Sequence, residues 1–347
     1  MPSIIIFPGQ GSQFIGMGKK LLDVPKVSRM FEIASNVFKF DLLSLCLNGP
    51  KNDLDKTRIC QPAIFVTSLA AVEYLKHTQP DIVKECYATA GFSIGEYASL
   101  VLSGAVTYED ALKLIKVRSE AMQEASQAVS SGLMSVFVNR DSKLNSGMLA
   151  ARKWCREKLK IEEPIECQIA NYLFSKCKVI GGNTEALDFL ELNKKEFGIN
   201  KVKRLAVSGA FHTKLMKSAE EKFNKEIDKI VIKTPVIKFY SNYDANLCMN
   251  PKKIRFNLVR QIANPVKWEQ ILNTLYYDEN LPTSDNEKTE NLIYLDRLGN
   301  QLNSEKKFQS KERLYPNIYE CGPVAQTGPI LKAINFKAFS FYKHIDV

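Results

Sequence analysis

One short segment of the chain has the pattern of a catalytic serine. Residues 91–96, Gly-Phe-Ser-Ile-Gly-Glu, fit Gly-x-Ser-x-Gly, the strand–turn–helix motif called a nucleophile elbow. The apolar run Tyr87–Ala90 predicts a buried strand before it, and apolar residues from Tyr97 onward predict a helix after it. Ser93 would then stand at the top of a sheet beside the amides of a helix N-terminus. A plain small-residue turn without chemistry fits the same five residues equally well.

A serine nucleophile needs a base, and the chain has only three histidines. His77 ends a predicted helix, where a surface cap is the ordinary role. His344, close to the C-terminus and to Asp346, has the late position of the histidine in α/β-hydrolases, but a chain end tends to fray. His212 lies in the small-residue turn 207–213, which can hold an imidazole still. We therefore favour His212, for which no orienting acid is apparent.

A charged residue falls on the apolar face of the next predicted helix. This helix starts at Thr107, followed by Asp110 in a capping-box pattern. Arg118 stands three residues after Ile115 and four before Met122, on the same apolar stripe. A buried guanidinium needs a partner, because an unpaired buried charge is costly. Arg118 either forms a structural salt bridge or grips the carboxylate of a ligand.

The composition is that of a soluble globular protein. The 347 residues are 45% hydrophobic and 25% charged, enough for one large domain or two ordinary ones. No apolar run approaches the roughly 20 residues of a membrane helix, so we expect no membrane association. No signal peptide is predicted; for an organellar location, a presequence would lie outside this chain.

Cysteine, histidine and charge content limit the chemistry further. The eight cysteines form no C-x-x-C pair and are expected to be reduced thiols, and three histidines make a metal site improbable. The net charge of +10 suits an acidic partner. The charges are scattered without a basic tract, which argues against nucleic-acid binding.

The first predicted strand leads into a glycine-rich loop. Ile4–Phe7 runs into residues 8–18, which contain Gln10 and Gln13 but neither the Walker nor the dinucleotide-binding spacing. Ligands of open α/β sheets bind at this C-terminal edge. Ala63–Lys76 predicts a buried helix with Pro62 near its start.

The periodicity changes between residues 131 and 207, where it predicts a β-α-β-β-α-β unit. The expected elements are Met134–Val138, Lys143–Leu159, Ile165–Ala170, Lys178–Gly181, Thr184–Phe197 and Val202–Val207. This order is that of ferredoxin-like domains. After it we expect a helix at Lys214–Ile230, a strand at Val236–Ser241, a helix at Pro251–Ile262 and a last strand at Ile318–Glu320.

The predicted fold class is α/β. A large α/β-hydrolase-like catalytic domain would comprise residues 1–130 and 208–347, with a small ferredoxin-like subdomain inserted at 131–207. The polar, highly charged stretch 278–313 is predicted to be a surface-loop insertion.

Six motifs together resemble one enzyme family, the malonyl-CoA:acyl carrier protein transacylases, and most closely the mitochondrial type. The resemblance covers most of the chain apart from 278–313. Its motifs are Phe7–Gln13, Gln61–Ala63, Gly91–Glu96, Lys116–Arg118, Gly209–His212 and Gln261 followed by Asn264–Val266.

The resemblance implies roles for particular residues. Ser93 would be the nucleophile that becomes malonylated, and His212 its general base and later general acid. A backbone carbonyl, at the position of Gln261, would orient His212 in place of an acid. The backbone N–H groups of Gln10 and Ile94 would form the oxyanion hole.

Three further residues would bind the substrate. By resemblance, Arg118 would hold the free carboxylate of malonate. Phe211 would leave little room for a methyl branch on the acyl group. Met122, one turn from Arg118 on the same face, is expected to contact the substrate as well.

The implied reaction is ping-pong transfer of malonyl from malonyl-CoA to the phosphopantetheine thiol of holo-acyl carrier protein, for type II mitochondrial fatty acid synthesis. It needs no cofactor or metal, and the family implies a monomer in the mitochondrial matrix. Lys201, Lys203 and Arg204 are candidate contacts of the acidic carrier protein, with a solvated face as the alternative. A serine thioesterase or esterase with the same elbow is the alternative function.

Two positions depart from the family pattern. Phe92 stands where many members have histidine, a difference shared with the mitochondrial type. The usual Gly-Pro-Gly near the C-terminus is Gly322-Pro323-Val324 here. If position 324 required a positive φ, valine would strain the loop.

Overall fold

The structure is a computed structural model of the chain that describes residues 2–277 and 315–347, together with the backbone of six short strands between them. These six form three antiparallel pairs: β8 (Thr283–Ser284) with β13 (Glu312–Arg313), β9 (Lys288–Thr289) with β12 (Lys307–Phe308), and β10 (Leu292–Leu295) with β11 (Gln301–Ser304). The predicted surface insertion at 278–313 otherwise lies outside the described residues.

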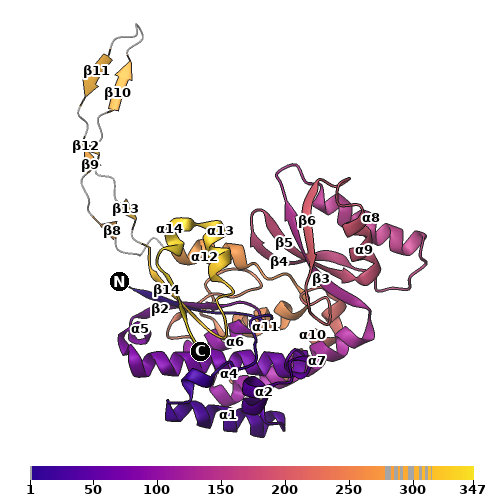
Figure 1. Cartoon of the computed structure of the whole chain (residues 1–347), viewed down its shortest axis with the longest axis horizontal. Coiled ribbons are helices and arrows are strands. Elements are labelled where there is room, and N and C mark those ends of the chain that lie inside the picture. Colours follow the sequence, from indigo (N-terminus) through magenta and orange to yellow (C-terminus); the bar gives the residue numbers. More distant parts are fainter. Residues whose placement is uncertain are drawn as a thin grey trace.

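A five-stranded parallel sheet is the centre of the large domain (Figure 1). Its order is β15 (Tyr342–Ile345), β14 (Asn317–Cys321), β1 (Ser3–Phe7), β2 (Cys86–Gly91) and β7 (Lys238–Phe239). The central strand β1 is buried along its whole length, as expected for a parallel sheet covered on both faces. The C-terminal ends of β1 and β2 lie side by side, since Phe7 is in register with Gly91.

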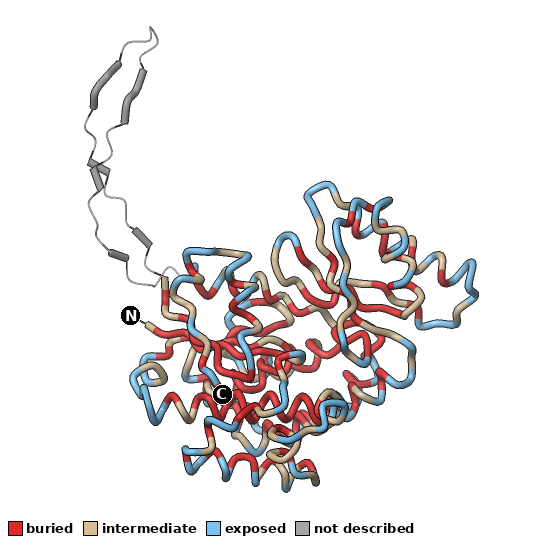
Figure 2. Tube along the Cα trace, viewed as in Figure 1, coloured by how far each residue is buried: buried red, intermediate tan, exposed pale blue. Residues whose placement is uncertain are grey.

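Helices cover both faces of this sheet (Figures 1 and 2). Ile5 and Phe7 point into the larger core and Ile4 and Ile6 into the smaller one. The larger core includes residues of α1 (Pro25–Phe38), α2 (Leu42–Asn48), α3 (Lys51–Leu54), α4 (Thr57–Thr78), α6 (Gly95–Leu102), α7 (Tyr108–Ala128), α10 (Lys217–Ile227) and α11 (Pro251–Ala263). The smaller core includes residues of α12 (Trp268–Tyr276), α13 (Gly328–Ile334) and α14 (Phe336–Phe339). Short helical turns complete the domain at η1 (Lys19–Leu21), α5 (Pro80–Lys84) and η2 (Lys214–Met216).

A second, antiparallel sheet stands beside the large domain. Its chain order is β3 (Ser131–Val138), α8 (Leu144–Glu157), β4 (Cys167–Phe174), β5 (Cys177–Asn183), α9 (Thr184–Leu192) and β6 (Ile199–Arg204). The strands lie in the order β4-β5-β3-β6, which is the ferredoxin-like arrangement of the predicted unit. Helices α8 and α9 share an apolar core with one face of the sheet. The predicted fold class is confirmed; the exact domain boundaries stay a prediction.

The C-terminus corrects two expectations. Ile318–Glu320 belongs to β14, but β15 follows it, so the predicted last strand is not the last. His344 lies within β15, in register with Glu320, instead of in a frayed tail. Three further contacts fix the terminus: Ile345 and Val347 are buried, and Asp346 pairs with Lys20.

Smaller differences concern element ends and one loop. Helix α4 begins at Thr57, so Pro62 lies inside the helix, and burial of nearly every residue around it stabilises the longer form. Strand β7 is only two residues long, because Val236, predicted to be part of it, is exposed and bonds to the Ser103 carbonyl. Val324 does not adopt a positive φ, so the Gly322-Pro323-Val324 loop is unstrained there.

Along the described residues, no helix has both the length and the hydropathy to span a membrane.

Candidate active site

The segment 91–96 forms a sharp turn between β2 and α6. Ser93 sits at its apex with φ of 54°, a left-handed conformation that is uncommon for a non-glycine residue. Both glycines of the motif are needed for packing. A side chain on Gly91 would overlap the backbone of Gly95, and one on Gly95 would come within 2.6 Å of the Phe7 and Pro8 carbonyl oxygens. The turn therefore packs directly on the end of β1.

Asn242 holds this turn in its strained shape. Its Oδ1 accepts the Ser93 N–H at 2.7 Å, and its Nδ2 donates to the Gly91 carbonyl at 2.7 Å. Its own N–H donates to Glu96 Oε1 at 3.0 Å. No sequence motif points to Asn242, which lies in a loop after β7.

Ser93 and His212 are in direct contact. Ser93 Oγ lies 2.8 Å from His212 Nε2, and His212 Nδ1 lies 2.7 Å from the backbone oxygen of Gln261. A carbonyl oxygen only accepts, so Nδ1 carries the proton and, in the neutral ring, Nε2 is free to accept from the serine. Burial, together with the positive charge of Arg118, lowers the pKa of His212 to about 3. The imidazole is therefore in its basic form at neutral pH.

Arg118 is fully buried directly behind the serine. Its Nη2 donates to Ser93 Oγ at 3.0 Å and to Gln261 Oε1 at 2.9 Å, and its Nη1 donates to Gln61 Oε1 at 2.6 Å. Its Nε has no hydrogen-bond partner. Among the described residues no carboxylate forms a salt bridge with it, so the structural ion pair considered above is not found. Burial lowers the pKa of Arg118, and the nearby Tyr97 and Glu96 offset part of that effect.

Gln261 connects Arg118 to a buried acid. Its Nε2 donates to Glu96 Oε2 at 2.6 Å and to the Ser93 carbonyl at 2.9 Å. Glu96 is completely buried, and burial raises the pKa of its carboxyl to about 7. Gln261 thus orients His212 with its backbone and Arg118 with its side chain.

Two backbone N–H groups beside Ser93 are available to a ligand. Neither the Gln10 N–H nor the Ile94 N–H donates a hydrogen bond to any other described residue. Gln10 is in the loop after β1, and Ile94 is the N-cap residue of α6. A pair of free N–H groups next to a nucleophile can stabilise an oxyanion.

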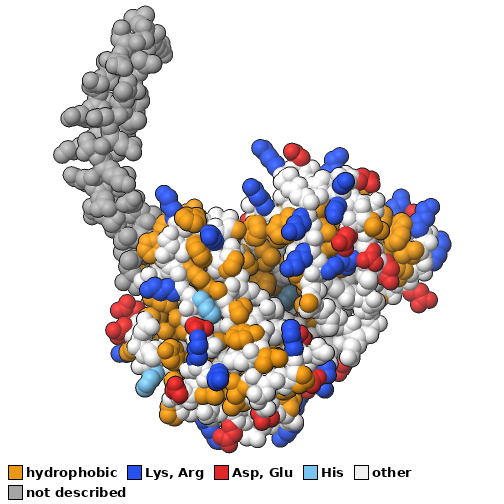
Figure 3. Space-filling model, viewed as in Figure 1, with side chains coloured by type: hydrophobic (Ala, Val, Ile, Leu, Met, Phe, Trp, Pro, Cys, Tyr) orange, Lys and Arg blue, Asp and Glu red, His pale blue; other side chains and the backbone are white. Residues whose placement is uncertain are grey.

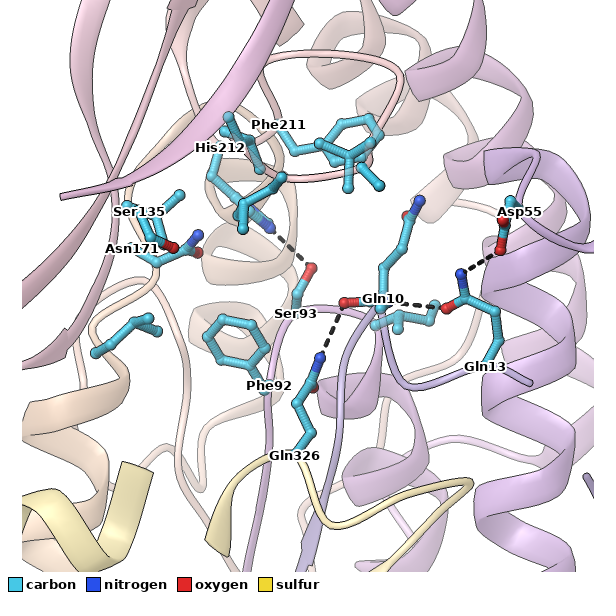
Figure 4. A pocket seen from close by; sticks show the side chains of 18 of the residues that line it. Gln10, Gln13, Asp55, Phe92, Ser93, Ser135, Asn171, Phe211, His212 and Gln326 are labelled. Carbon is cyan, nitrogen blue, oxygen red and sulfur yellow. Dashed lines mark hydrogen bonds between the residues drawn. The ribbon is translucent and has the colours of Figure 1, made fainter. Parts of the chain in front are cut away.

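A cavity of about 490 Å³ opens in front of these groups, between the large domain and the small sheet. Figure 4 shows Ser93, His212, Phe92 and Gln10 facing it, with Ser135 and Asn171 of the small sheet beside them. In the space-filling view, hydrophobic side chains gather in the hollow between the two parts, with Lys and Arg side chains on the small-sheet side (Figure 3). Phe211 and Met122 also line the cavity.

The eight residues singled out in the sequence analysis are therefore close together. Ser93, His212, Gln261 and Arg118 form one hydrogen-bonded network. The other four line the cavity: Gln10, Ile94, Phe211 and Met122. Gln61, whose motif was noted without a role, binds both Arg118 and the sulfur of Met122. In the described part of the chain, no group of histidine, cysteine or acidic side chains has the arrangement of a metal site.

Comparison with known proteins identifies the family of the chain. Residues 4–281 match the family model of the acyl transferase domain. The human mitochondrial malonyl-CoA–acyl carrier protein transacylase is 43% identical over 99% of this chain and 80% of its own length. The chain belongs to this acyl transferase family. The malonyl CoA–acyl carrier protein transacylase of Bacillus subtilis is 36% identical over 78% of this chain and 81% of its own.

Solved structures of the family have the same fold. The malonyl-CoA:acyl carrier protein transacylase of Xanthomonas oryzae aligns over 100% of this chain and 95% of its own, with a TM-score of 0.80 and 25% identity. A malonyl-transacylase solved in complex with a type II PKS acyl-carrier protein aligns over 100% and 96%, with a TM-score of 0.76 and 26% identity. The resemblance stated from the motifs is confirmed, and no comparison supports a thioesterase.

Proposed function

We propose that this chain transfers a malonyl group from malonyl-CoA to the phosphopantetheine thiol of holo-acyl carrier protein through a malonyl-Ser93 intermediate. The observation that carries the proposal is Arg118. It is buried, it has no carboxylate partner among the described residues, and its Nη2 lies 3.0 Å from Ser93 Oγ. An acyl group on Ser93 that ends in a free carboxylate would place this carboxylate next to the Arg118 guanidinium as its ion-pair partner.

In the first half-reaction His212 Nε2 takes the proton of Ser93 Oγ as the oxygen attacks the thioester carbonyl. The Gln10 and Ile94 N–H groups bind the resulting oxyanion. When the carbonyl re-forms, the carbon–sulfur bond breaks and CoA leaves as a thiol with the proton from His212. Malonyl-Ser93 remains, with His212 neutral again and its Nδ1–H on the Gln261 carbonyl.

Arg118 has two effects in this sequence. Its fork of N–H donors holds the malonyl carboxylate, which fixes the acyl group in one pose. Its charge also contributes to the low pKa of His212. Pairing of Arg118 with the substrate carboxylate offsets that charge, so His212 becomes a stronger base when the correct substrate is bound.

In the second half-reaction the carrier protein's thiol gives its proton to His212 and attacks the ester. The carbon–oxygen bond breaks, and Ser93 recovers its proton from the imidazole. Transfer exceeds hydrolysis only if water is a poor competitor. Ser93 and His212 are 8% and 3% exposed, which leaves little room for bulk water at the ester.

The shape of the pocket supports a small, unbranched acyl group. Phe211 is almost fully buried beside His212, and Gln61 donates a hydrogen bond to the sulfur of Met122. A methyl branch next to the ester would meet these side chains, and cores accommodate an added methyl only at a cost. We therefore expect malonyl to be preferred over methylmalonyl.

The proposed partner is holo-acyl carrier protein, as in the solved complex of a related malonyl-transacylase. Lys203 and Arg204 line the cavity, although Arg204 is already paired with Asp188 and Glu191. We propose action in the mitochondrial matrix, by analogy with the human, mouse and fly relatives named as mitochondrial, and as a monomer. The reaction calls for no cofactor besides these two substrates.

The test is incubation with malonyl-CoA followed by mass spectrometry of the peptide containing Ser93. We expect a malonyl adduct on Ser93, absent from Ser93→Ala, that disappears on addition of holo-acyl carrier protein as malonyl-carrier protein forms. Apo-carrier protein, which lacks the thiol, is the matched control. Release of free malonate without malonyl-carrier protein would mean that the chain is a thioesterase.

A further inference from the structure

The loop after β14 departs from the family pattern at Val324, and its next residues reach the active site. We propose that Gln326 is a positioning residue that fixes the oxyanion-binding N–H of Gln10. The inference rests on the function proposed above, because it concerns the rate at which Ser93 is acylated. Gln326 itself is half-buried at the edge of the cavity, and Figure 4 shows its side chain pointing toward the Gln10 loop.

The side-chain amide of Gln326 binds the backbone on both sides of the Gln10 N–H. Its Oε1 accepts the Gly9 N–H at 2.7 Å, and its Nε2 donates to the Gln10 carbonyl at 3.0 Å. The Gly9 carbonyl is held separately, by Ser12 Oγ at 2.7 Å. In a trans peptide the N–H points opposite to the carbonyl. The Gly9 carbonyl is bound to Ser12, and the peptide groups before and after the Gly9–Gln10 peptide are bound to Gln326. Together these hydrogen bonds fix the direction in which the Gln10 N–H points.

The C-terminal strands hold Gln326 in turn. Glu320, buried at the end of β14, accepts the backbone N–H groups of Gln326 at 3.1 Å and of Thr327 at 2.8 Å. It also accepts the hydroxyl of Tyr342 from β15. His344 Nε2 donates to the Gly322 carbonyl at 2.9 Å, and a side chain on Gly322 would overlap Pro8. His344, rejected as a base, thus supports the loop that carries Gln326.

This arrangement matters because an oxyanion hole works through preorganised donors. Removing one such donor costs about 10²–10³-fold in rate, and a donor that is present but wrongly aimed loses part of that. Ile94 needs no such support, since the start of α6 fixes its N–H. The Gln10 N–H lies in a loop with no regular structure, so its direction depends on side-chain contacts.

The experiment compares Gln326→Met with the native chain in single-turnover acylation over a series of malonyl-CoA concentrations up to saturation, quenched and followed by mass spectrometry of the Ser93 peptide. Methionine keeps the length and apolar volume but forms neither hydrogen bond. We expect the acylation rate constant to fall about 10- to 100-fold, with the half-saturating malonyl-CoA concentration and the fraction of Ser93 finally acylated unchanged. Gln326→Glu keeps the acceptor for Gly9 but turns a carboxylate toward the Gln10 carbonyl, and should be at least as slow. Val324→Ala, an exposed neighbour, is the matched control and should react at the native rate.

The outcomes separate positioning from folding and from the proposed function. Either Gln326 variant could show a smaller final fraction of acylated Ser93 but the native acylation rate constant. Gln326 would then be needed only for folding, and the inference would be overturned. A Val324→Ala rate as slow as the Gln326 variants would also overturn it, because any change in the loop would then suffice. If the native chain itself is not malonylated, the proposed function fails; if it is malonylated and Gln326→Met is equally fast, only the positioning role fails.

Discussion

The two walls of the cavity differ in how their polar groups are connected to one another. On the elbow wall, Ser93, His212, Arg118 and Gln261 are bound to one another and to the backbone before any ligand arrives. The small-sheet wall combines apolar lining residues such as Leu133, Leu173 and Val179 with the polar residues Ser135, Asn171, Lys203 and Arg204. Its Asn171 is 5% exposed, and the Oδ1 of that side chain has no hydrogen-bond partner.

This difference indicates that the two walls have different roles in the proposed reaction. A hydrogen-bonded network of fixed geometry suits bond making and breaking, since its donors need no reorganisation during the reaction. A wall that combines apolar side chains with a few polar ones suits binding of a long, partly apolar arm, which CoA and the carrier protein share in the proposed function. Substitutions on the elbow wall should therefore change kcat and acyl selectivity, and those on the sheet wall should change KM alone.

Ser93→Ala tests the elbow wall most severely. Without the oxygen there is no covalent intermediate, so transfer from malonyl-CoA to carrier protein should fall by about 10⁴-fold or more. The measurement is steady-state formation of malonyl-carrier protein. His212→Ala, which keeps the serine but removes its base, should give a comparable loss. Substantial transfer by Ser93→Ala would show that the thiol attacks malonyl-CoA directly.

Arg118→Gln is expected to have the next largest effect. Loss of two charge-assisted hydrogen bonds to the malonyl carboxylate, each worth about 1.5–3 kcal/mol, should lower malonyl transfer by roughly 10²–10⁴-fold. Acetyl transfer should fall much less, because acetyl has no carboxylate. The measurement is the ratio of kcat/KM for malonyl-CoA and acetyl-CoA. Equal losses for the two would mean that Arg118 acts mainly through its bond to Ser93 Oγ.

The parts of this wall that could be predicted are those with local signals. The elbow is six consecutive residues, and the helical period placed Arg118 on the buried face of α7, where it is found. The β-α-β-β-α-β unit was predicted because each of its elements is long enough to show its own periodicity.

Contacts between distant segments could not be predicted from the sequence. Asn242 binds Ser93 across 149 positions, and Gln326 binds Gln10 across 316. Strand β15 has four residues at the chain end, and its pairing with β14 is what makes it a strand. Asn and Gln side chains in loops have no period, so only the folded chain shows which of them support the site.

The pKa of His212 provides a further, smaller test of the elbow wall. Its folded value is lowered to about 3, so protonation of this base should not reduce kcat/KM until the pH falls toward that value. In an NMR titration the His212 ring signals, assigned by their loss in His212→Gln, should not shift between about pH 5 and pH 8. Arg118→Gln should raise the pKa, because it removes a nearby positive charge. A native His212 that titrates at its ordinary value would show that burial in this wall does not control the base.

The smallest effect is expected on the sheet wall. Ser135, Val179 and Asn171 stand opposite one another on β3, β5 and β4, so they form a row that faces the cavity. Asn171→Leu keeps the volume but removes a cavity-lining side-chain amide that can form a hydrogen bond with the ligand. One such bond is worth about 0.5–1.5 kcal/mol, so KM for malonyl-CoA should rise about two- to tenfold with kcat unchanged.

Leu173→Met is the matched control for this wall, because it changes side-chain shape but no polar group. It should leave both kinetic constants within about twofold of the native values. If Asn171→Leu instead lowers kcat at constant KM, the sheet wall takes part in the chemistry, and the division between the two walls is wrong. If the rise in KM appears with both malonyl-CoA and holo-acyl carrier protein, the amide contacts the arm that the two substrates share.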